Sequence, residues 1–183
     1  MNIKLTVFLF FGTFYFNAIH AKDNLVQFNN YQIIEEKTDS LQKNISFALE
    51  EKIDSLIEFS KQFIGLKYRY GSANPKGFDC SGFVGYVFSQ FGYKLGRTSS
   101  EQYKNGIPVY KKDTKPGDLV FFQEKNRNGT YRISHVGIIV SVNVEDETFC
   151  FIHSCRRGIL IDNSTMEYYH KRFYGIRRII VNE

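Results

Sequence analysis

The chain has 183 residues, 43% of them apolar and 18 of them phenylalanine, which excludes general disorder and suits one domain with a small appendage. Its formal net charge is +5, but the basic residues are scattered, so a solvated basic surface is the plain interpretation. Three cysteines are an odd number, and at least one thiol is therefore expected to be free if the protein is exported.

The N-terminus has the pattern of a secretory signal peptide. Lys4 precedes the apolar run 5–16, and Ala18 to Ala21 ends on a small residue. We predict a signal peptide over residues 1–21, cut after Ala21, and an exported mature protein, which also disfavours nucleic acid as a partner. A retained anchor is the alternative, but the run is shorter than the roughly 20 residues that a membrane span needs. No later segment is predicted to cross a membrane.

Residues 22–50 are rich in Asn, Lys, Glu and Gln, and they predict a linker or a loosely packed, partly helical N-terminal extension. Residues 51–183 are expected to form the folded domain. The stretch "EEKIDSLIEFSKQFIG" places apolar residues at helical spacing and ends at Gly65, which predicts an amphipathic helix. The loop "LKYRYGSANPKG" then leads to the next element.

The stretch "GFDCSGF" sets Cys80 between an aspartate and a serine. Apolar residues follow at helical spacing and Gly92 stands where a C-terminal cap would, so Cys80 is predicted to open a helix. The free N–H groups and the dipole at a helix N-terminus favour a thiolate. The sequence therefore predicts a lowered pKa and fast alkylation for Cys80.

After this helix the apolar period changes to that of strands. Four strands are expected, and the charged segments 124–132 and 143–147 are expected to form hairpin loops. Helices first and antiparallel strands afterwards predict an α+β domain with helices packed on one face of the sheet. The predicted strands are "KPGDLVFFQ", "SHVGIIVSV", "TFCFIHS" and "GIRRIIV".

Two histidines lie on adjacent predicted strands. His135 shares a face with Gly137, which would allow close approach of another element, and His153 shares a face with Phe149 and Phe151. A thiol, a histidine and a second polar group suit a nucleophile, a base and a group that orients the base. A hydrogen-bonded structural role is the alternative for each histidine. His170 is expected at the surface.

Cys150, His153 and Cys155 suggest a rival use as a zinc site. Their spacing does not match paired zinc ligands, and strand alternation puts His153 on the face opposite Cys150, so no metal is predicted. A disulfide between Cys150 and Cys155 would need Cα atoms within about 7 Å and hence a turn at Ser154.

The segments "KYRYGSANPKGFDCSGFVGYVF", "RTSSEQY", "KPGDLVFF", "SHVGIIV" and "FIHS" resemble, in this order, those of the NlpC/P60 cysteine peptidases. These are papain-like hydrolases of bacterial cell walls, with helices packed on a mainly antiparallel sheet. The similarity covers roughly residues 53–180, and an ordered set of motifs is far more specific than any one of them. The chain departs from the family pattern at Arg69-Tyr70 and Gly71-Ser72, before the cysteine.

The resemblance implies roles for six residues. Cys80 would be the nucleophile, His135 the general base and His153 the group that orients it. Tyr68, Asp79 and Ser81 would bind substrate. Core packing is the alternative for Tyr68, and helix capping is the alternative for Asp79 and Ser81.

The expected function is cleavage of peptidoglycan stem peptides, commonly after γ-D-glutamate, by an exported monomer that needs no metal or organic cofactor. Amidase or acyl-transfer chemistry on the same three residues is an alternative within enzymes. A cell-wall-binding domain without catalysis is the alternative from another class, although a binding module has no need of Cys80, His135 and His153 together.

Overall fold

The computed structural model describes the backbone of residues 4–181 and the side chains of residues 32 and 34–181. The chain divides into two compact units, residues 1–47 and 48–183. The elements are α1 (Lys4–Lys61), β1 (Ala73–Asn74), β2 (Gly77–Phe78), α2 (Cys80–Gln90), α3 (Ser99–Gln102), β3 (Ile107–Val109), a 3₁₀ turn (Lys111–Asp113), β4 (Leu119–Lys125), β5 (Tyr131–Asn143), β6 (Thr148–Cys155), β7 (Gly158–Asn163), α4 (Glu167–His170) and β8 (Phe173–Arg178).

The N-terminal unit is helical throughout its described part. The expected linker or extension, residues 22–50, belongs to α1, and the side chains of residues 34–48 are exposed. The first three residues of the predicted signal peptide lie outside the described residues. Cleavage after Ala21 stays a prediction. Among the described residues no helix is both long and apolar enough to cross a membrane.

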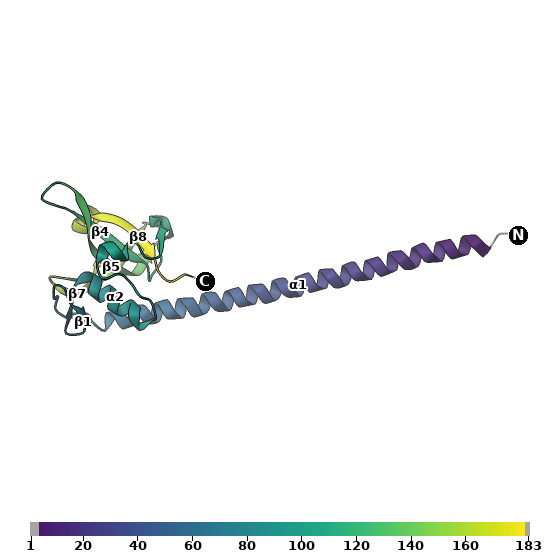
Figure 1. Ribbon diagram of the computed structural model, residues 1–183, viewed down its shortest axis with the longest axis horizontal. Coiled ribbons are helices and arrows are strands. Elements are labelled where there is room, and N and C mark those ends of the chain that lie inside the picture. The colour runs from purple at the N-terminus through teal and green to yellow at the C-terminus, as the bar shows by residue number, and fades with distance from the viewer. Residues whose placement is uncertain (1–3, 182–183) are drawn as a thin grey trace. The chain divides into compact units, whose positions relative to one another are not determined.

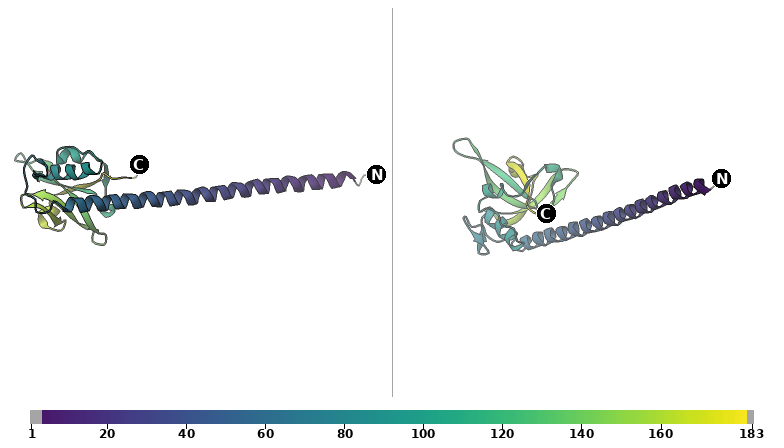
Figure 2. Two further views of the ribbon diagram at one scale, coloured as in Figure 1. Left: turned by 90° about the horizontal axis from the view of Figure 1, so that it is seen from below. Right: turned by 45° about the vertical axis from the view of Figure 1, so that its right-hand side comes forward.

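The second unit is built on a six-stranded antiparallel sheet with the strand order β3-β8-β4-β5-β6-β7. Figure 1 shows β8, β4 and β5 side by side, and Figure 2 shows the same sheet from two other sides. A separate pair, β1 and β2, precedes α2. The α+β prediction, with helices packed on a mainly antiparallel sheet, is confirmed.

The two faces of the sheet carry different clusters. The first cluster packs α2 and the end of α1 against the sheet, through Leu56, Phe83 and Phe121 among others. The second cluster, on the alternate residues of the strands, includes Phe122 and Phe151. Strand alternation therefore buries both faces, which explains why β4 reads as a continuous apolar run in the sequence.

The predicted apolar helix does begin at Cys80, and Gly92 beyond its end has φ +87°. The four predicted strands correspond to β4, β5, β6 and β8. The short pair β1 and β2, in the segment expected to be a loop, and the strands β3 and β7 of the large sheet were not predicted. Of these strands, β7 matters most for the candidate site, because it carries a carboxylate to that site. It follows β6 after a two-residue turn at Arg156-Arg157.

Candidate active site

Asp79 fixes the start of α2. Its carboxylate accepts a hydrogen bond from the backbone N–H of Gly82 at 2.6 Å, which satisfies one of the free donors at the helix N-terminus. Gly82 is required because a Cβ there would lie 2.2 Å from the carbonyl oxygen of Ser72. The Asp-Cys-Ser-Gly motif therefore caps the helix and lets the preceding loop pack close to Cys80.

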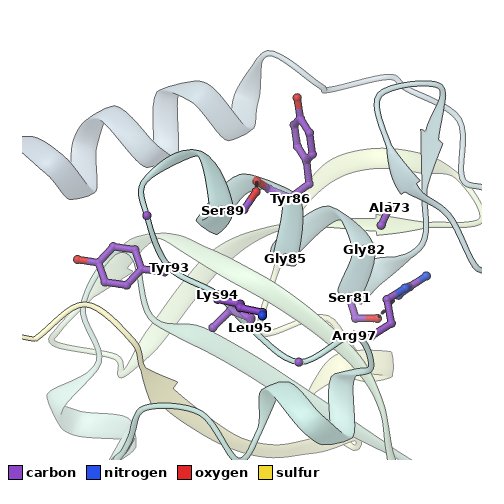
Figure 3. Close-up of a pocket in the computed structure, with 12 residues that line it drawn as sticks. Ala73, Ser81, Gly82, Gly85, Tyr86, Ser89, Tyr93, Lys94, Leu95 and Arg97 are labelled. Atoms are coloured by element: carbon purple, nitrogen blue, oxygen red, sulfur yellow. Dashed lines mark hydrogen bonds between the residues drawn. The ribbon is translucent and has the colours of Figure 1, made fainter.

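The carboxylate of Asp79 also binds Arg97 in a two-pronged ion pair, with N–O distances of 3.1 and 2.6 Å. The guanidinium donates as well to the hydroxyl of Ser81 at 3.2 Å. Figure 3 shows Ser81 and Arg97 together at the wall of a pocket of about 430 Å³ between α2 and the loop 92–97. The capping alternative for Asp79 is thus observed, and Arg97 holds two of the three predicted substrate-binding side chains, Asp79 and Ser81.

Cys80 lies against the backbone of β5. Its sulfur is 4.0 Å from the carbonyl oxygen of Ser134, the residue before His135. Burial raises the pKa of Cys80, and the negative charge of Asp79 raises it further, while backbone N–H groups, including that of Val136, oppose the shift. The expected lowering of this pKa is therefore wrong: desolvation and a like charge outweigh the helix N-terminus. At neutral pH the resting side chain is a thiol, which needs a base.

The two predicted histidines are brought together. Nε2 of His135 lies 2.8 Å from Nδ1 of His153, and the rings are perpendicular. The predicted close approach at Gly137 is confirmed, since a Cβ there would lie 2.7 Å from the ring of Phe151 and 3.2 Å from Cβ of His153. Burial lowers the pKa of His135 to about 3, and His153 acts in the same direction. His135 is thus a neutral base at physiological pH.

The second nitrogen of His153 is also occupied. Nε2 lies 3.0 Å from a carboxylate oxygen of Asp162 on β7, and the guanidinium of Arg157 donates to the same oxygen. The hydroxyl of Tyr169 lies 3.4 Å from Nε2 of His153. Burial lowers the pKa of His153, although Asp162 opposes the shift. His153 is therefore neutral, fully buried and hydrogen-bonded at both nitrogens.

A hollow of about 600 Å³ opens beside His135, and its wall includes Tyr68, Ser134 and Arg156. Burial raises the pKa of Tyr68, with a further contribution from the nearby Cys80, so the predicted position of this side chain at the site is consistent with the structure. Arg156 is exposed and forms no ion pair within the described part of the chain. The hollow thus combines the candidate base with an available positive charge.

The rival zinc and disulfide arrangements are not formed. Cys150 and Cys155 are free, and both lie on the extended strand β6. Within the described residues no group of three or more His, Cys, Asp or Glu side chains is placed to hold a metal ion. His170 is exposed, as the sequence predicts.

Three side chains around His153 were not predicted from the sequence, namely Asp162, Arg157 and Tyr169. A signal was present for the first of these: Gly158 followed by "ILID" has the turn residue and β-branched content of a strand that pairs back on "FIHS". An acidic residue on such a strand lies within reach of a histidine on its neighbour.

A helix that begins at a cysteine and packs on an antiparallel sheet is the arrangement of a papain-like α+β fold, and here the sheet carries a histidine pair. The chain belongs to the NlpC/P60 family, whose family model matches residues 65–178. The resemblance drawn from the sequence motifs is confirmed.

The relatives are identical to this chain at about a third of the aligned positions. Identity is 37% over 126 residues with "Probable endopeptidase p60" of Listeria grayi, covering 69% of this chain and 22% of that protein. It is 33% over 127 residues with gamma-DL-glutamyl hydrolase of Bacillus subtilis, covering 68% and 29%. With murein DD-endopeptidase MepS/murein LD-carboxypeptidase of Escherichia coli it is 36% over 118 residues, covering 63% and 57%.

The solved structures agree with this assignment. An NLP/P60-family protein of Staphylococcus aureus, described as similar to lipoprotein, superposes with a TM-score of 0.62 at 28% identity, covering 72% of this chain and 42% of that one. An NlpC/P60 protein of Bacillus cereus gives 0.61 at 31% identity, covering 70% and 40%. The chain thus spans well under two thirds of the length of these proteins.

Proposed function

We propose that this chain is a cysteine peptidase of the bacterial cell envelope that hydrolyses stem peptides of peptidoglycan. The observation that carries the proposal is the hydrogen-bonded pair of His135 and His153 beside a cysteine at a helix N-terminus. The names of the relatives support the substrate class, since they describe a gamma-DL-glutamyl hydrolase and a murein endopeptidase. The predicted signal peptide supports export.

In the proposed reaction the thiol of Cys80 attacks the peptide carbonyl while His135 takes its proton. Backbone N–H groups at the start of α2, including that of Cys80, stabilise the oxyanion. His135 returns the proton to the amine, which leaves as the C–N bond breaks. Water, deprotonated by His135, then hydrolyses the thioester and regenerates the thiol. The neutral state of both groups at rest makes this proton transfer part of the attack itself.

The charged side chains that line the hollow are one carboxylate, Glu124, and two guanidiniums, so a peptide that carries carboxylates meets a cation there. Arg156, which has no ion pair among the described residues, offers a cation in the hollow beside His135, whereas Arg97 is already paired with Asp79. Stem peptides with γ-linked glutamate carry a free α-carboxylate at the residue before the scissile bond. We propose cleavage after γ-D-glutamate, and Tyr68, Asp79 and Ser81 are proposed as substrate contacts.

The test is digestion of purified peptidoglycan by the wild-type protein, by Cys80→Ala and by the matched control Cys150→Ala, with mass spectrometry of the released fragments. Wild type and Cys150→Ala are expected to release the same stem-peptide fragments, and Cys80→Ala none. Fragment masses identify the bond: cleavage at a D,D cross-link would overturn the γ-glutamyl assignment. Binding to peptidoglycan with no release by any of the three would overturn the peptidase proposal in favour of a binding domain.

A further inference from the structure

Asp162 lies behind the histidine pair and has no place in the Cys80, His135 and His153 scheme. It is on β7, its residue is 7% exposed, and one oxygen lies 3.0 Å from Nε2 of His153. His153 in turn lies 2.8 Å from His135 through its other nitrogen. A continuous line of side chains therefore runs from the buried carboxylate to the candidate base.

The carboxylate is ionised and can only accept hydrogen bonds. Burial opposes its ionisation, yet hydrogen bonds from His153, Tyr169 and Arg157 hold the pKa of Asp162 below its usual range. Arg157 and Tyr169 come from the β6–β7 turn and from α4, so the carboxylate is anchored from two elements besides its own. Asp162 is thus fixed in both position and charge.

These bonds determine where the ring protons lie. Because Asp162 accepts, Nε2 of His153 carries the proton of this neutral ring, and its Nδ1 has a lone pair. That lone pair must accept from Nε2–H of His135 across the 2.8 Å contact. The remaining nitrogen of His135, Nδ1, is then unprotonated, which is the state that a base toward Cys80 requires.

The charge of Asp162 also favours the action of His135 as a base during the reaction. Burial and His153 both lower the pKa of His135, whereas Asp162 raises it. An imidazolium formed on His135 after proton transfer is therefore stabilised by this carboxylate through His153. The ion pair with Arg157 weakens this electrostatic stabilisation of His135, but it leaves the oxygen of Asp162 that accepts from His153 in place.

We propose that Asp162 is a positioning residue that extends the triad into a line of four, Cys80, His135, His153 and Asp162, by selecting the tautomer of both histidines. The catalytic effect of Asp162 rests on the proposed function, because the tautomer matters for catalysis only if His135 acts as a base. The tautomers themselves can be observed directly, so the proposal can be tested with or without a substrate.

The first readout is the ¹⁵N spectrum of the histidine rings in protein labelled at histidine, assigned through single histidine substitutions. In the wild type, His153 is expected to be protonated at Nε2 and bare at Nδ1, and His135 likewise. A wild-type His153 protonated at Nδ1 would overturn the proposal without any variant of Asp162. Asp162→Ala is expected to convert the single tautomer into a mixture.

The second readout is kinetic. Asp162→Ala removes the acceptor, so kcat is expected to fall about 10²-fold or more with KM little changed. Asp162→Asn keeps an oxygen that can accept from His153 and Arg157, so it should retain the tautomer and lose less than about 10-fold. Rescue by this conservative variant separates positioning from general destabilisation.

Asp118 provides the matched control. It is a second buried carboxylate, 1% exposed, bound by Arg178 at 2.7 Å, and it lies at the turn before β4 rather than beside a histidine. Asp118→Ala is expected to lower stability while leaving the histidine spectra and kcat unchanged. If hydrolysis depends on Cys80 but Asp162→Ala keeps both the wild-type tautomers and kcat, the four-residue line is wrong and the peptidase proposal stands. If hydrolysis is absent and the tautomers respond to Asp162→Ala as expected, the four-residue line stands and the peptidase proposal is wrong.

Discussion

At the scale of single residues, Asp79 has two opposed effects. Its carboxylate caps α2, an interaction that contributes about 0.5–2 kcal/mol of stability. Its charge also raises the pKa of the adjacent Cys80. The ion pair with Arg97 offsets part of that charge, so the reactivity of Cys80 depends on this partly buried ion pair as well as on the histidines.

Asp79→Asn is expected to separate the two effects. Asparagine caps helices about as well as aspartate, so the helix start is retained, while loss of the negative charge lowers the pKa of Cys80. The measurement is the rate of alkylation by iodoacetamide against pH, in a background with Cys150 and Cys155 changed to serine. The midpoint should move to lower pH.

Arg97→Gln is the companion variant, with an effect of opposite sign. It leaves the charge of Asp79 uncompensated, so the midpoint of Cys80 alkylation should move to higher pH. Shifts in the same direction for the two variants would contradict this electrostatic account of Cys80.

At the scale of elements, the pairing of β5 with β6 sets the distance between the two histidines. Gly137 on β5 lets β6 approach so closely that a Cβ there would lie 3.1 Å from the carbonyl oxygen of Ile152. The missing side chain is thus what allows His153 to reach His135 at 2.8 Å.

Gly137→Ala is expected to push β6 away and to lengthen the histidine contact. Overpacking of this kind costs about 1–3 kcal/mol of stability, and we expect a larger proportional loss of kcat, since proton transfer depends on alignment. Unfolding by denaturant and peptidoglycan digestion measure the two effects. Gly85→Ala in α2 is the control, because its Cβ meets only the side chain of Gln102 at 3.4 Å. Equal losses in both variants would contradict the argument.

The same elements show how far sequence reasoning reaches. The start of α2 at Cys80 was predictable because the cap, the apolar spacing and the terminal glycine are all local signals. So were β5 and β6, and with them the pairing of His135 with His153. The contact between His153 and Asp162 was not predictable, because it depends on the register between β6 and β7. His153 pairs with Leu160, and Asp162 is the diagonal neighbour of His153 on the same face. The raised pKa of Cys80 likewise depends on burial, which no local pattern reveals.

At the scale of the whole molecule, the fully buried His153 and the partly buried His135 link stability to pH. An unfolded histidine titrates near 6.5, whereas burial lowers the pKa of both His135 and His153. Below pH 6.5 the unfolded chain therefore binds more protons than the folded protein, and stability falls as pH falls. Asp162, whose pKa is lowered, loses its contribution only at still lower pH, as pH falls through its folded value.

The free energy of unfolding should accordingly fall between pH 7 and pH 5, by about 1–2 kcal/mol from His135 and by a further amount of the same sign from His153, measured by guanidinium denaturation. His135→Gln removes one titrating group and should flatten this dependence, whereas His170→Gln, a change at an exposed position, should leave it as in the wild type. The basic net charge also weakens the folded state in acid, but that effect is common to both variants and cancels in their comparison. A protein as stable at pH 5 as at pH 7 would mean that both histidines titrate in the folded protein as they do in the unfolded chain, and it would contradict the lowered pKa values of the pair.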